Sequence, residues 1–583
     1  MRRHLLGPHA DRTALILATL LTLPFCWVGL FADDYFHQLA IEQTVLIPVG
    51  RWDFFTFAWN NPAIMQPIIE HGPYSWWTLP DLKFSFLRPL TCVLANFDSF
   101  AFGRAFFFHH LHSLLWYVAL VAVVTALFRR SLGLASPVAA LAAILFAIDD
   151  SHTVMAGWIA NRNALIATVP ALLGVLAHVW WREKGDRRGL PLSLLGCAVG
   201  LCGGEPALGA IVYLIAYELT AGPGTWRTRM LALAPLSLLG AGYIVIYKVT
   251  NSGAYGSEMY VDPLHEPLRY LIQAPAKALA LIGAQFLGST ADLWIVLNKA
   301  RPVLAALGGL ALVLMVVLMR RLWSGLEEPE RRGLRWLTLG ASLSLVPVLA
   351  TFPLNRLLLM PSVGGSALIA SVLWHGWSSA DRVLRFGARL LFFTSVVLGL
   401  LGWPATALMF KLGGDEMTRA ALQTKMSDEV LSGRVLVFVA PDPMASLYWP
   451  LVRGWHGKKF PRSFITLSFA PFAHRLTRTA IDTVELEVVN GRMLETVFEQ
   501  LMRSSKFPVP LGMKVRLEGA ELTVIGFDQG LPNRVSLHFD ENPEVSGYTI
   551  ARWDEKGELA PLVLPSIGQS IELPRLNGLL SVP

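Results

Sequence analysis

Five short polar stretches stand out in an otherwise apolar chain, because their carboxylates and guanidinium groups could handle protons and phosphates. FADDYFHQLA places Asp33 and Asp34 just after a long apolar segment. A carboxylate there can accept a proton from an attacking hydroxyl, or it can cap a following helix. FLRPLT places Arg88 before Pro89. The fork of a guanidinium suits a phosphate, although an arginine beside an apolar segment can instead extend to lipid headgroups if that segment lies in a membrane.

The other three stretches follow later in the chain. CGGEPAL holds Glu205, and FPLNRLLLMPSVGG holds Arg356 at the start of an apolar run. Taken singly, each stretch has an ordinary structural interpretation: an exposed turn at Glu205, a membrane anchor at Arg356 and a polar hairpin at residues 148–167. Charged residues at membrane depth are nevertheless functional candidates. Residues 148–167, IDDSHTVMAGWIANRNALIA, join two apolar runs and gather six candidate site residues: Asp149, Asp150, His152, Trp158, Asn161 and Arg162.

The composition identifies a polytopic membrane protein. Of 583 residues, 54% are hydrophobic and 16% charged, against about 25% charged in soluble domains, and the mean hydropathy is +0.48. The net charge of +7 fits basic cytoplasmic loops. No basic, aromatic-interleaved face predicts nucleic-acid binding. No disulfide framework is expected, since the four cysteines lie in or beside apolar runs: Cys26, Cys92, Cys197 and Cys202.

Apolar runs of about 20 residues predict the membrane spans. Basic clusters that begin at Arg2, Arg129, Arg182, Arg227, Arg320 and Arg382 fall at alternate loops, so the positive-inside rule predicts a cytoplasmic N-terminus. The polar stretches and everything after Lys411 are then extracytoplasmic, which means periplasmic in a Gram-negative bacterium. Segment 270–299 fits an interfacial or a re-entrant segment. About eleven spans are predicted, at 13–31, 106–128, 134–148, 164–181, 190–203, 206–220, 230–247, 302–319, 335–352, 357–375 and 388–410.

The composition changes near residue 414. RVLVFVAPD is followed by a stretch of helical character. VELEVV, KVRLEG, ELTVIGF, RVSLHF and SGYTIARW then alternate with period two between turn signals, which is typical of strands. We therefore predict a membrane module at 1–413 and an extracytoplasmic soluble domain of α+β type at 414–583, with a small helical element and a C-terminal antiparallel β-sandwich.

The order of the polar stretches resembles the GT-C superfamily, whose polytopic glycosyltransferases use polyprenyl-phosphate sugars. The closest resemblance is to the protein O-mannosyltransferase-like membrane module of the TMTC family, whose pattern reads DD, YRPL, HPxHTEAVxWxxGRADLL, KE and RxLYLPSxGF. The resemblance covers roughly residues 13–410, and no TPR array follows. The chain departs from the pattern at Asp149-Asp150, Val154 and Gly204, which replace HP, Glu and Lys. The matching stretches begin at Asp33, Phe86, Asp149, Gly204 and Arg356.

The resemblance implies a GT-C-like fold, substrates and residue roles. Asp33, and after it Asp34, would be the base or the carboxylate that orients the acceptor, while Arg88, Arg162 and Arg356 would bind the lipid phosphate. The donor would be a polyprenyl-phosphate sugar carrying mannose or another hexose. The acceptor would be an extracytoplasmic protein or glycan. The membrane module would also contact membrane lipids. Some GT-C enzymes use a divalent metal and others do not, and the sequence does not decide between them.

Three functions stay open on sequence alone. They are a glycosyltransferase, an inactive relative acting as a membrane scaffold or receptor, and a transporter of lipid or glycan. A transporter would spread polar residues through broken helices in corresponding halves, whereas here they gather at one face, which favours the enzyme. His109 and His112 share a helical face without a third ligand at helical spacing, so packing is preferred over a metal site. Aromatic residues of the C-terminal domain could stack on sugars, although such residues more often form the core.

Overall fold

The chain folds into two compact units in the computed structural model, which describes residues 9–554, 556–576 and 578. Arg2 and Arg3 of the first basic cluster lie outside the described residues. Unit 1 contains residues 1–30, 86–252 and 263–411, and unit 2 contains residues 31–85, 253–262 and 412–583. The junction at 411 and 412 adjoins the change in composition near 414. The two earlier segments of unit 2 were not expected, and the two-domain division at 413 stays a prediction.

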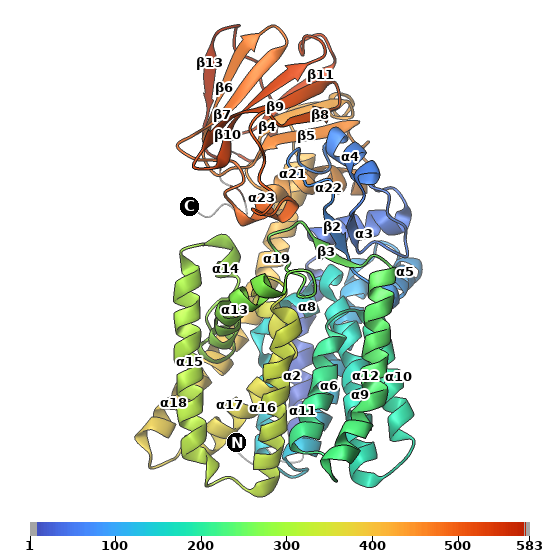
Figure 1. The fold of residues 1–583 in the computed structure, drawn as a ribbon, viewed down its shortest axis with the longest axis vertical. Helices are drawn as coiled ribbons and strands as arrows, with labels where there is room; N and C mark the ends of the chain where they lie inside the picture. The colour runs from blue at the N-terminus through green and yellow to red at the C-terminus, as the bar shows by residue number, and fades with distance from the viewer. Residues whose placement is uncertain (1–8, 555, 577, 579–583) are drawn as a thin grey trace. The chain divides into compact units, whose positions relative to one another are not determined.

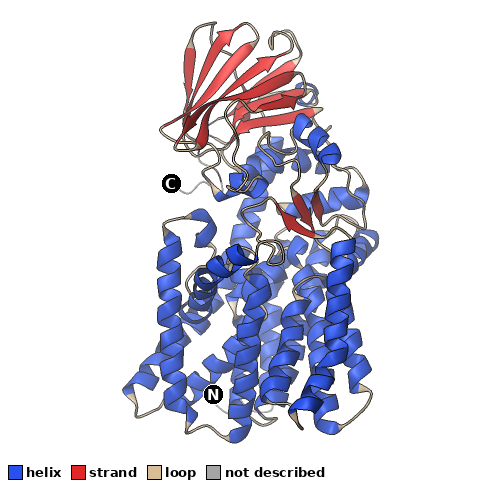
Figure 2. Cartoon of the chain, in the orientation of Figure 1, coloured by secondary structure: helices blue, strands red, loops and turns tan. Residues whose placement is uncertain are grey.

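Unit 1 is a bundle of helices (Figures 1 and 2). Within the described residues, seven helical segments are long and apolar enough to cross a membrane: Ala10–Trp27, Phe106–Leu132, Ile159–Lys184, Trp226–Val249, Pro267–Leu287, Ala300–Trp323 and Arg382–Leu422. A pair of helices bent by 44°, Pro137–Ile148 and Asp150–Gly157, would count as an eighth span. A polytopic α-helical membrane protein is therefore confirmed, while the count of about eleven spans is not.

Four predicted spans are too short or too charged to belong to these seven. Helices α10 (Gly189–Gly203) and α11 (Ala207–Thr220) are apolar but short. Helix α17 (Pro361–Gly376) has 16 residues, and α16 (Glu328–Val348) begins with the charged sequence EPERR. One candidate span lies where none was predicted. Segment 270–299 contains most of helix α13 (Pro267–Leu287), which is long and apolar enough to cross a membrane, and a short helix follows it.

The remaining helical elements complete unit 1, and the last of them continues into unit 2. They are α2 (Ala10–Thr22), η1 (Leu23–Trp27), α5 (Pro89–Phe102), α6 (Phe106–Leu132), α7 (Pro137–Ile148), η2 (Asp150–His152), α8 (Thr153–Gly157), η3 (Ile159–Asn161), α9 (Asn163–Lys184), α12 (Trp226–Val249), α14 (Leu293–Val296), α15 (Ala300–Trp323), η4 (Asn355–Leu358), α18 (Arg382–Phe392), the π-helical η5 (Phe393–Leu398) and α19 (Gly399–Leu422).

Small residues let α9 and α10 pack closely, and this packing positions two of the polar stretches. Gly196 and Gly200 repeat at a spacing of four in α10. A Cβ added at Gly196 would lie 2.6 Å from the carbonyl oxygen of Pro170, and one at Gly200 would lie 2.7 Å from that of Ala167. Small residues at this spacing are a common helix contact in membranes. Because α10 is held against α9, the turn that carries Glu205 follows beside the first residues of α9.

Unit 2 combines short helices with three sheets (Figure 2). Its antiparallel three-stranded sheet joins the two early segments and contains β1 (Thr56–Trp59), β2 (Lys83–Ser85) and β3 (Gly253–Tyr255). A buried cluster of Phe36, Ile47 and Ile68 anchors the first helix of the unit. The helices are α3 (Asp33–Glu42), α4 (Pro62–His71), α20 (Asp428–Leu431), α21 (Pro443–Leu447), α22 (Trp449–Trp455) and α23 (Val497–Met502).

The six-stranded sheet of unit 2 is antiparallel throughout, as predicted. Its spatial order is β13 (Ser570–Leu573), β6 (Ala473–Ala480), β7 (Thr483–Val489), β10 (Leu531–Phe539), β9 (Ala520–Asp528) and β8 (Lys514–Leu517).

The four-stranded sheet differs from the prediction of an antiparallel sandwich. Its order is β12 (Leu559–Pro561), β11 (Tyr548–Trp553), β4 (Arg434–Val439) and β5 (Ser463–Ser468). Strand β4 pairs in parallel with both β5 and β11, so the prediction is wrong for this sheet. Every residue of β4 after the first is buried. This is the continuous apolar run of a parallel strand that is covered on both faces.

Candidate functional site

The residues singled out from the sequence are divided between the two units. Asp33 and Asp34 belong to unit 2, and Arg88, Arg162 and Arg356 belong to unit 1 together with the hairpin residues and Glu205. Each group is therefore described within its own unit.

In unit 2, the acidic pair begins helix α3, and its two members have different contacts. The Asp34 side chain is buried, and its Oδ2 accepts a hydrogen bond from the backbone N–H of Phe31 at 3.0 Å. Phe31 precedes the N-cap residue Ala32, so this bond ties the first turn of the helix to the segment that leads into it. Asp33 accepts a hydrogen bond from the hydroxyl of Tyr448. Asp34 thus fixes the helix start, and Asp33 is held by a side chain from the C-terminal part of the chain.

Tyr448 is positioned for this role by the helix that it precedes. It stands immediately before α22, which packs against α3. Burial, followed by the charge of Asp33 and the hydrogen bond to it, raises the pKa of Tyr448 well above 10. Burial and the charge of Asp33 likewise raise the pKa of the nearby Tyr74. Tyr448 therefore keeps its proton and acts as a hydrogen-bond donor to Asp33.

In unit 1, Arg88 and Glu205 form an ion pair between two of the polar stretches. Arg88 Nε lies 3.0 Å from Glu205 Oε2, and Tyr247 Oη donates to Glu205 Oε1 at 3.2 Å. Arg88 directly precedes Pro89, the first residue of α5, and its guanidinium lies 4.8 Å from the ring centroid of Phe86. The Arg88 and Glu205 side chains are 19% and 26% exposed, so this pair can still be reached by a ligand.

Arg162 belongs to a buried network that the sequence did not predict. Its Nη2 donates to Asp98 Oδ2, and its Nη1 donates to the carbonyl oxygen of His109 at 3.0 Å. Asp98 Oδ1 lies 2.6 Å from His112 Nδ1, and Trp116 Nε1 donates to His112 Nε2 at 3.0 Å. Arg162 is 2% exposed and the Asp98 side chain 0%. The pair therefore fastens the hairpin to α5, and Arg162 can bind a phosphate only if the pair opens.

The hairpin of residues 149–162 makes a second set of contacts with the stretch around Arg356. His152 is fully buried, and its Nε2 lies 2.8 Å from Ser362 Oγ. The Arg356 guanidinium lies 5.8 Å from the ring centroid of Trp158. Asn161 Nδ2 is buried and has no hydrogen-bond partner among residues 9–554, 556–576 and 578.

Acidic residues gather near Arg356. Asp149 accepts hydrogen bonds from Ser151 N at 3.0 Å and from Gln285 Nε2 at 3.3 Å. Asp292 Oδ2 accepts from Asn355 N at 3.2 Å. Burial raises the pKa of Asp292, although the hydrogen bond from Asn355 and the positive charge of Arg356 oppose this effect. Asp150 interacts electrostatically with Asp149 and Asp292. Arg356 thus lies in an acidic setting and makes no hydrogen bond or ion pair with any described residue.

A metal site is not apparent in the described parts of the chain, where no group of three or more His, Cys, Asp or Glu side chains could hold an ion. His109 and His112 do not converge on one point. His109 Nε2 contacts the carbonyl oxygen of Gly103 at 2.9 Å, whereas His112 contacts Asp98 and Trp116.

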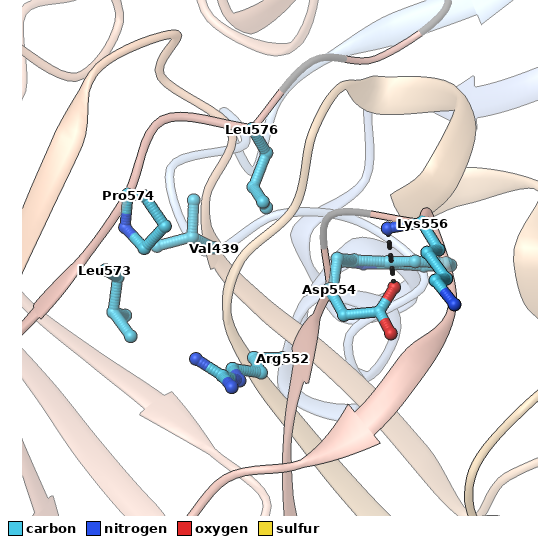
Figure 3. Close-up of a pocket in the computed structure, with 8 residues that line it drawn as sticks. Val439, Arg552, Asp554, Lys556, Leu573, Pro574 and Leu576 are labelled. Atoms are coloured by element: carbon cyan, nitrogen blue, oxygen red, sulfur yellow. Dashed lines mark hydrogen bonds between the residues drawn. The ribbon is translucent and has the colours of Figure 1, made fainter.

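The sheets of unit 2 contain a small cavity of about 260 Å³ (Figure 3). Arg552, Asp554 and Lys556 form its polar wall, and Leu573, Pro574 and Leu576 contribute apolar side chains. The Asp554 carboxylate accepts from the backbone N–H of Lys556 at 2.9 Å and pairs with Lys425 at 2.5 Å. The negative charge in the cavity is therefore already neutralised.

Sequence reasoning missed three residues that hold the candidates in place. Asp98 could have been found as a lone acid in the apolar helix LTCVLANFDSFAF, where an unpaired charge would be costly. Asp292 follows an apolar segment in the same manner as Asp33. Tyr448 carries no local signal, because its partner Asp33 is 415 residues away.

Comparisons with known proteins give a likeness to solved structures. No protein-family model and no curated protein matches the chain. Among solved structures, the chain is similar to ArnT from Cupriavidus metallidurans bound to undecaprenyl phosphate. The likeness covers 77% of this chain and 85% of that chain, at 13% sequence identity and a TM-score of 0.39.

Proposed function

We propose that the chain is an integral-membrane glycosyltransferase that transfers a sugar from a polyprenyl-phosphate donor to an extracytoplasmic acceptor. One observation carries the proposal: within unit 1, polar stretches that are distant in sequence contact one another. Arg88 pairs with Glu205 at 3.0 Å across 117 residues, and Arg356 lies over the ring of Trp158. Contacts between stretches that lie this far apart in the sequence are expected of a shared site. Their contacts support the shared site that the motif order implies.

The proposed reaction needs a base and a stabilised leaving group. The acceptor hydroxyl oxygen would attack the anomeric carbon of the donor, and its proton would pass to the Asp33 carboxylate. The bond between the anomeric carbon and the phosphate oxygen would break, and the lipid phosphate would leave with the electron pair. Tyr448 and Asp34 would orient Asp33. The charge that develops on the phosphate would be stabilised by arginine donors.

The three candidate arginines differ in their readiness to bind a phosphate. Arg356 makes no hydrogen bond or ion pair within the described residues, so its fork can take two phosphate oxygens. Arg88 is engaged with Glu205, and Arg162 is buried against Asp98. We therefore assign the first phosphate contact to Arg356. Arg88 would join it if substrate displaced Glu205, and Arg162 would contribute through the position of the hairpin.

A donor panel tests the proposal. The purified full-length protein would be incubated with polyprenyl-phosphate mannose and other polyprenyl-phosphate hexoses, with a mixture of extracytoplasmic glycans and peptides as acceptors. Release of polyprenyl phosphate above the level given by Asp33→Asn is expected with at least one donor. No release with any donor would reject the proposal.

A membrane scaffold without turnover is the second candidate, and one observation favours it. Two of the three arginines that the resemblance assigns to the phosphate are already paired with acids of the same unit. In a scaffold, these charge pairs would hold the helices together and would bind no phosphate. The donor panel separates the two functions, because a scaffold would release no lipid phosphate.

A further inference from the structure

A polar cavity at one end of the six-stranded sheet has no part in the chemistry proposed above. Its volume is about 550 Å³, within the roughly 300–1,000 Å³ typical of small-ligand sites. It is lined by the residue before β6, by β6, β7 and the loop after β7, and by the adjoining ends of β9 and β10 with the turn between them. All of its walls therefore belong to unit 2. The side chains used below are Phe472, Arg475, Glu487, Asn490, Arg492 and Asn533.

Both arginines of this cavity are already paired with carboxylates. Arg492 makes a two-pronged contact with Glu495, with N–O distances of 2.9 and 3.2 Å, and its Nη1 also donates to Gln529 Oε1. Arg475 lies 3.3 Å from Glu487, its direct neighbour across β6 and β7. Asp528 adds a third carboxylate to the lining. With three carboxylates and two arginines the lining has a slight negative excess, and an anion would have to displace carboxylates from the arginines, so the site disfavours an anionic ligand.

Two amide side chains in the cavity offer both donors and acceptors. Asn490 and Asn533 make no side-chain hydrogen bond with any residue that the structure describes. Asn533 lies at an irregularity in the pairing of β9 with β10, and bulges of this kind often redirect a side chain. Gly526 leaves room for it, because a Cβ there would lie 2.8 Å from Asn533 Oδ1. The amide is thus held in place by the strand rather than by a polar partner.

Phe472 adds one aromatic surface to this polar lining. Its ring lies directly against Gly491, where an added Cβ would come within 2.4 Å of the ring carbons. The Phe472 ring therefore packs against the backbone of Gly491, which restricts its rotation. An aromatic surface beside groups that both donate and accept matches a sugar ring, which has apolar C–H faces and hydroxyls around its edge.

We infer that this cavity binds a neutral saccharide unit, with Phe472 against the ring and Asn490, Asn533 and the paired charges on the hydroxyls. The site would hold the glycan of the acceptor. That acceptor role rests on the proposed function, whereas saccharide binding itself does not. Hydroxyls can donate to the carboxylates and accept from the arginines without breaking the ion pairs, and this distinguishes a saccharide from a phosphate or a carboxylate.

Binding to the full-length protein in detergent or nanodiscs tests the inference. The probes are maltose, cellobiose and α-1,6-mannobiose, with inorganic phosphate as the anionic comparison, measured by calorimetry without donor. At least one disaccharide should bind, and phosphate should not compete with it. Absence of binding by all three disaccharides, or preferential binding of phosphate, would overturn the inference.

Two cavity variants and one matched control locate the binding. Asn533→Asp, which is close to isosteric, and Phe472→Leu should each weaken disaccharide binding about tenfold. Arg516→Ala should leave binding unchanged, because it removes an exposed ion pair with Asp540 that involves the same sheet outside the cavity. Equal binding by all variants would also overturn the inference. Lipid-phosphate release is measured separately, so a protein that binds sugars without turnover would refute the proposed transferase and leave the cavity assignment intact.

Discussion

The Tyr448 hydroxyl donates a hydrogen bond to the Asp33 carboxylate within unit 2, although the two residues are 415 positions apart in the chain. Asp33 follows the first apolar segment, and Tyr448 lies between two short helices of the C-terminal part. The residue proposed as the base is therefore oriented by the part of the chain that the sequence assigned to a separate soluble domain.

Replacement of Tyr448 by Phe should lower turnover and leave donor affinity nearly unchanged. A hydrogen bond to a charged group contributes about 1.5–3 kcal/mol, so we expect kcat to fall roughly 10- to 100-fold with little change in KM. Tyr255→Phe is the matched control, because Tyr255 is 38% exposed and belongs to the same unit. A Tyr448→Phe enzyme that is as fast as Tyr255→Phe would remove Tyr448 from the positioning of Asp33.

Changes at Arg356 should act on the donor. Arg356→Ala removes the proposed phosphate contact, and we expect kcat/KM for the donor to fall roughly 10- to 100-fold, as for a lost charged hydrogen bond. Arg356→Lys should restore only part of this loss, because lysine lacks the two-pronged fork. The control is Arg321→Ala, which loses an exposed ion pair with Asp381 at 2.6 Å. Full activity of Arg356→Ala would assign the phosphate to other residues.

Asp98→Asn should destabilise unit 1 rather than impair one catalytic step. It leaves Arg162 buried without its counter-charge, and removal of one partner of a buried pair typically costs about 3–5 kcal/mol. Thermal unfolding in detergent measures the effect, with Asp381→Asn as the control, because Asp381 is partly exposed and its partner Arg321 is exposed. Equal unfolding temperatures for the two variants would mean that the pair with Arg162 contributes nothing to stability.

The same residue predicts a pH dependence of stability. Burial alone would raise the pKa of Asp98, but the hydrogen bond to His112 and the charge of Arg162 hold it below its usual value. The folded pKa thus lies below the unfolded value of about 3.9. The stabilisation from ionised Asp98 is then complete at pH values above the unfolded pKa, and it is lost as the pH falls through the folded pKa. Wild type should lose more stability between pH 6 and pH 3 than Asp98→Asn; an equal loss would contradict this.

The membrane class and the strand-rich C-terminal part could be predicted because each rests on local patterns. Apolar runs and basic loops identify spans one at a time, and period-two alternation identifies strands such as VELEVV. The exact count of spans could not be predicted in the same way. Helix α16 begins with several charges, and α17 is short, so composition alone does not separate a span from a buried helix.

The contacts of the candidate site could be predicted only in part, because they depend on distant residues. The pairing of Arg88 with Glu205 has no signature beyond the presence of both charges. The parallel pairing of β4 with β11 joins strands that are more than 100 residues apart. Arg162 looked available in a polar hairpin, yet Asp98 from α5 accepts its hydrogen bond. Tertiary packing decides which arginine is paired and which is available.

Release of polyprenyl phosphate by wild type and by Asp33→Asn tests the central claim most directly. Asp381→Asn is the matched control, since Asp381 is an acid at a helix start and is paired with Arg321. Loss of a general base typically costs about 10²–10⁴-fold in rate. We expect Asp33→Asn to fall by at least about 100-fold and Asp381→Asn to equal wild type. Equal release by wild type and Asp33→Asn would contradict the account.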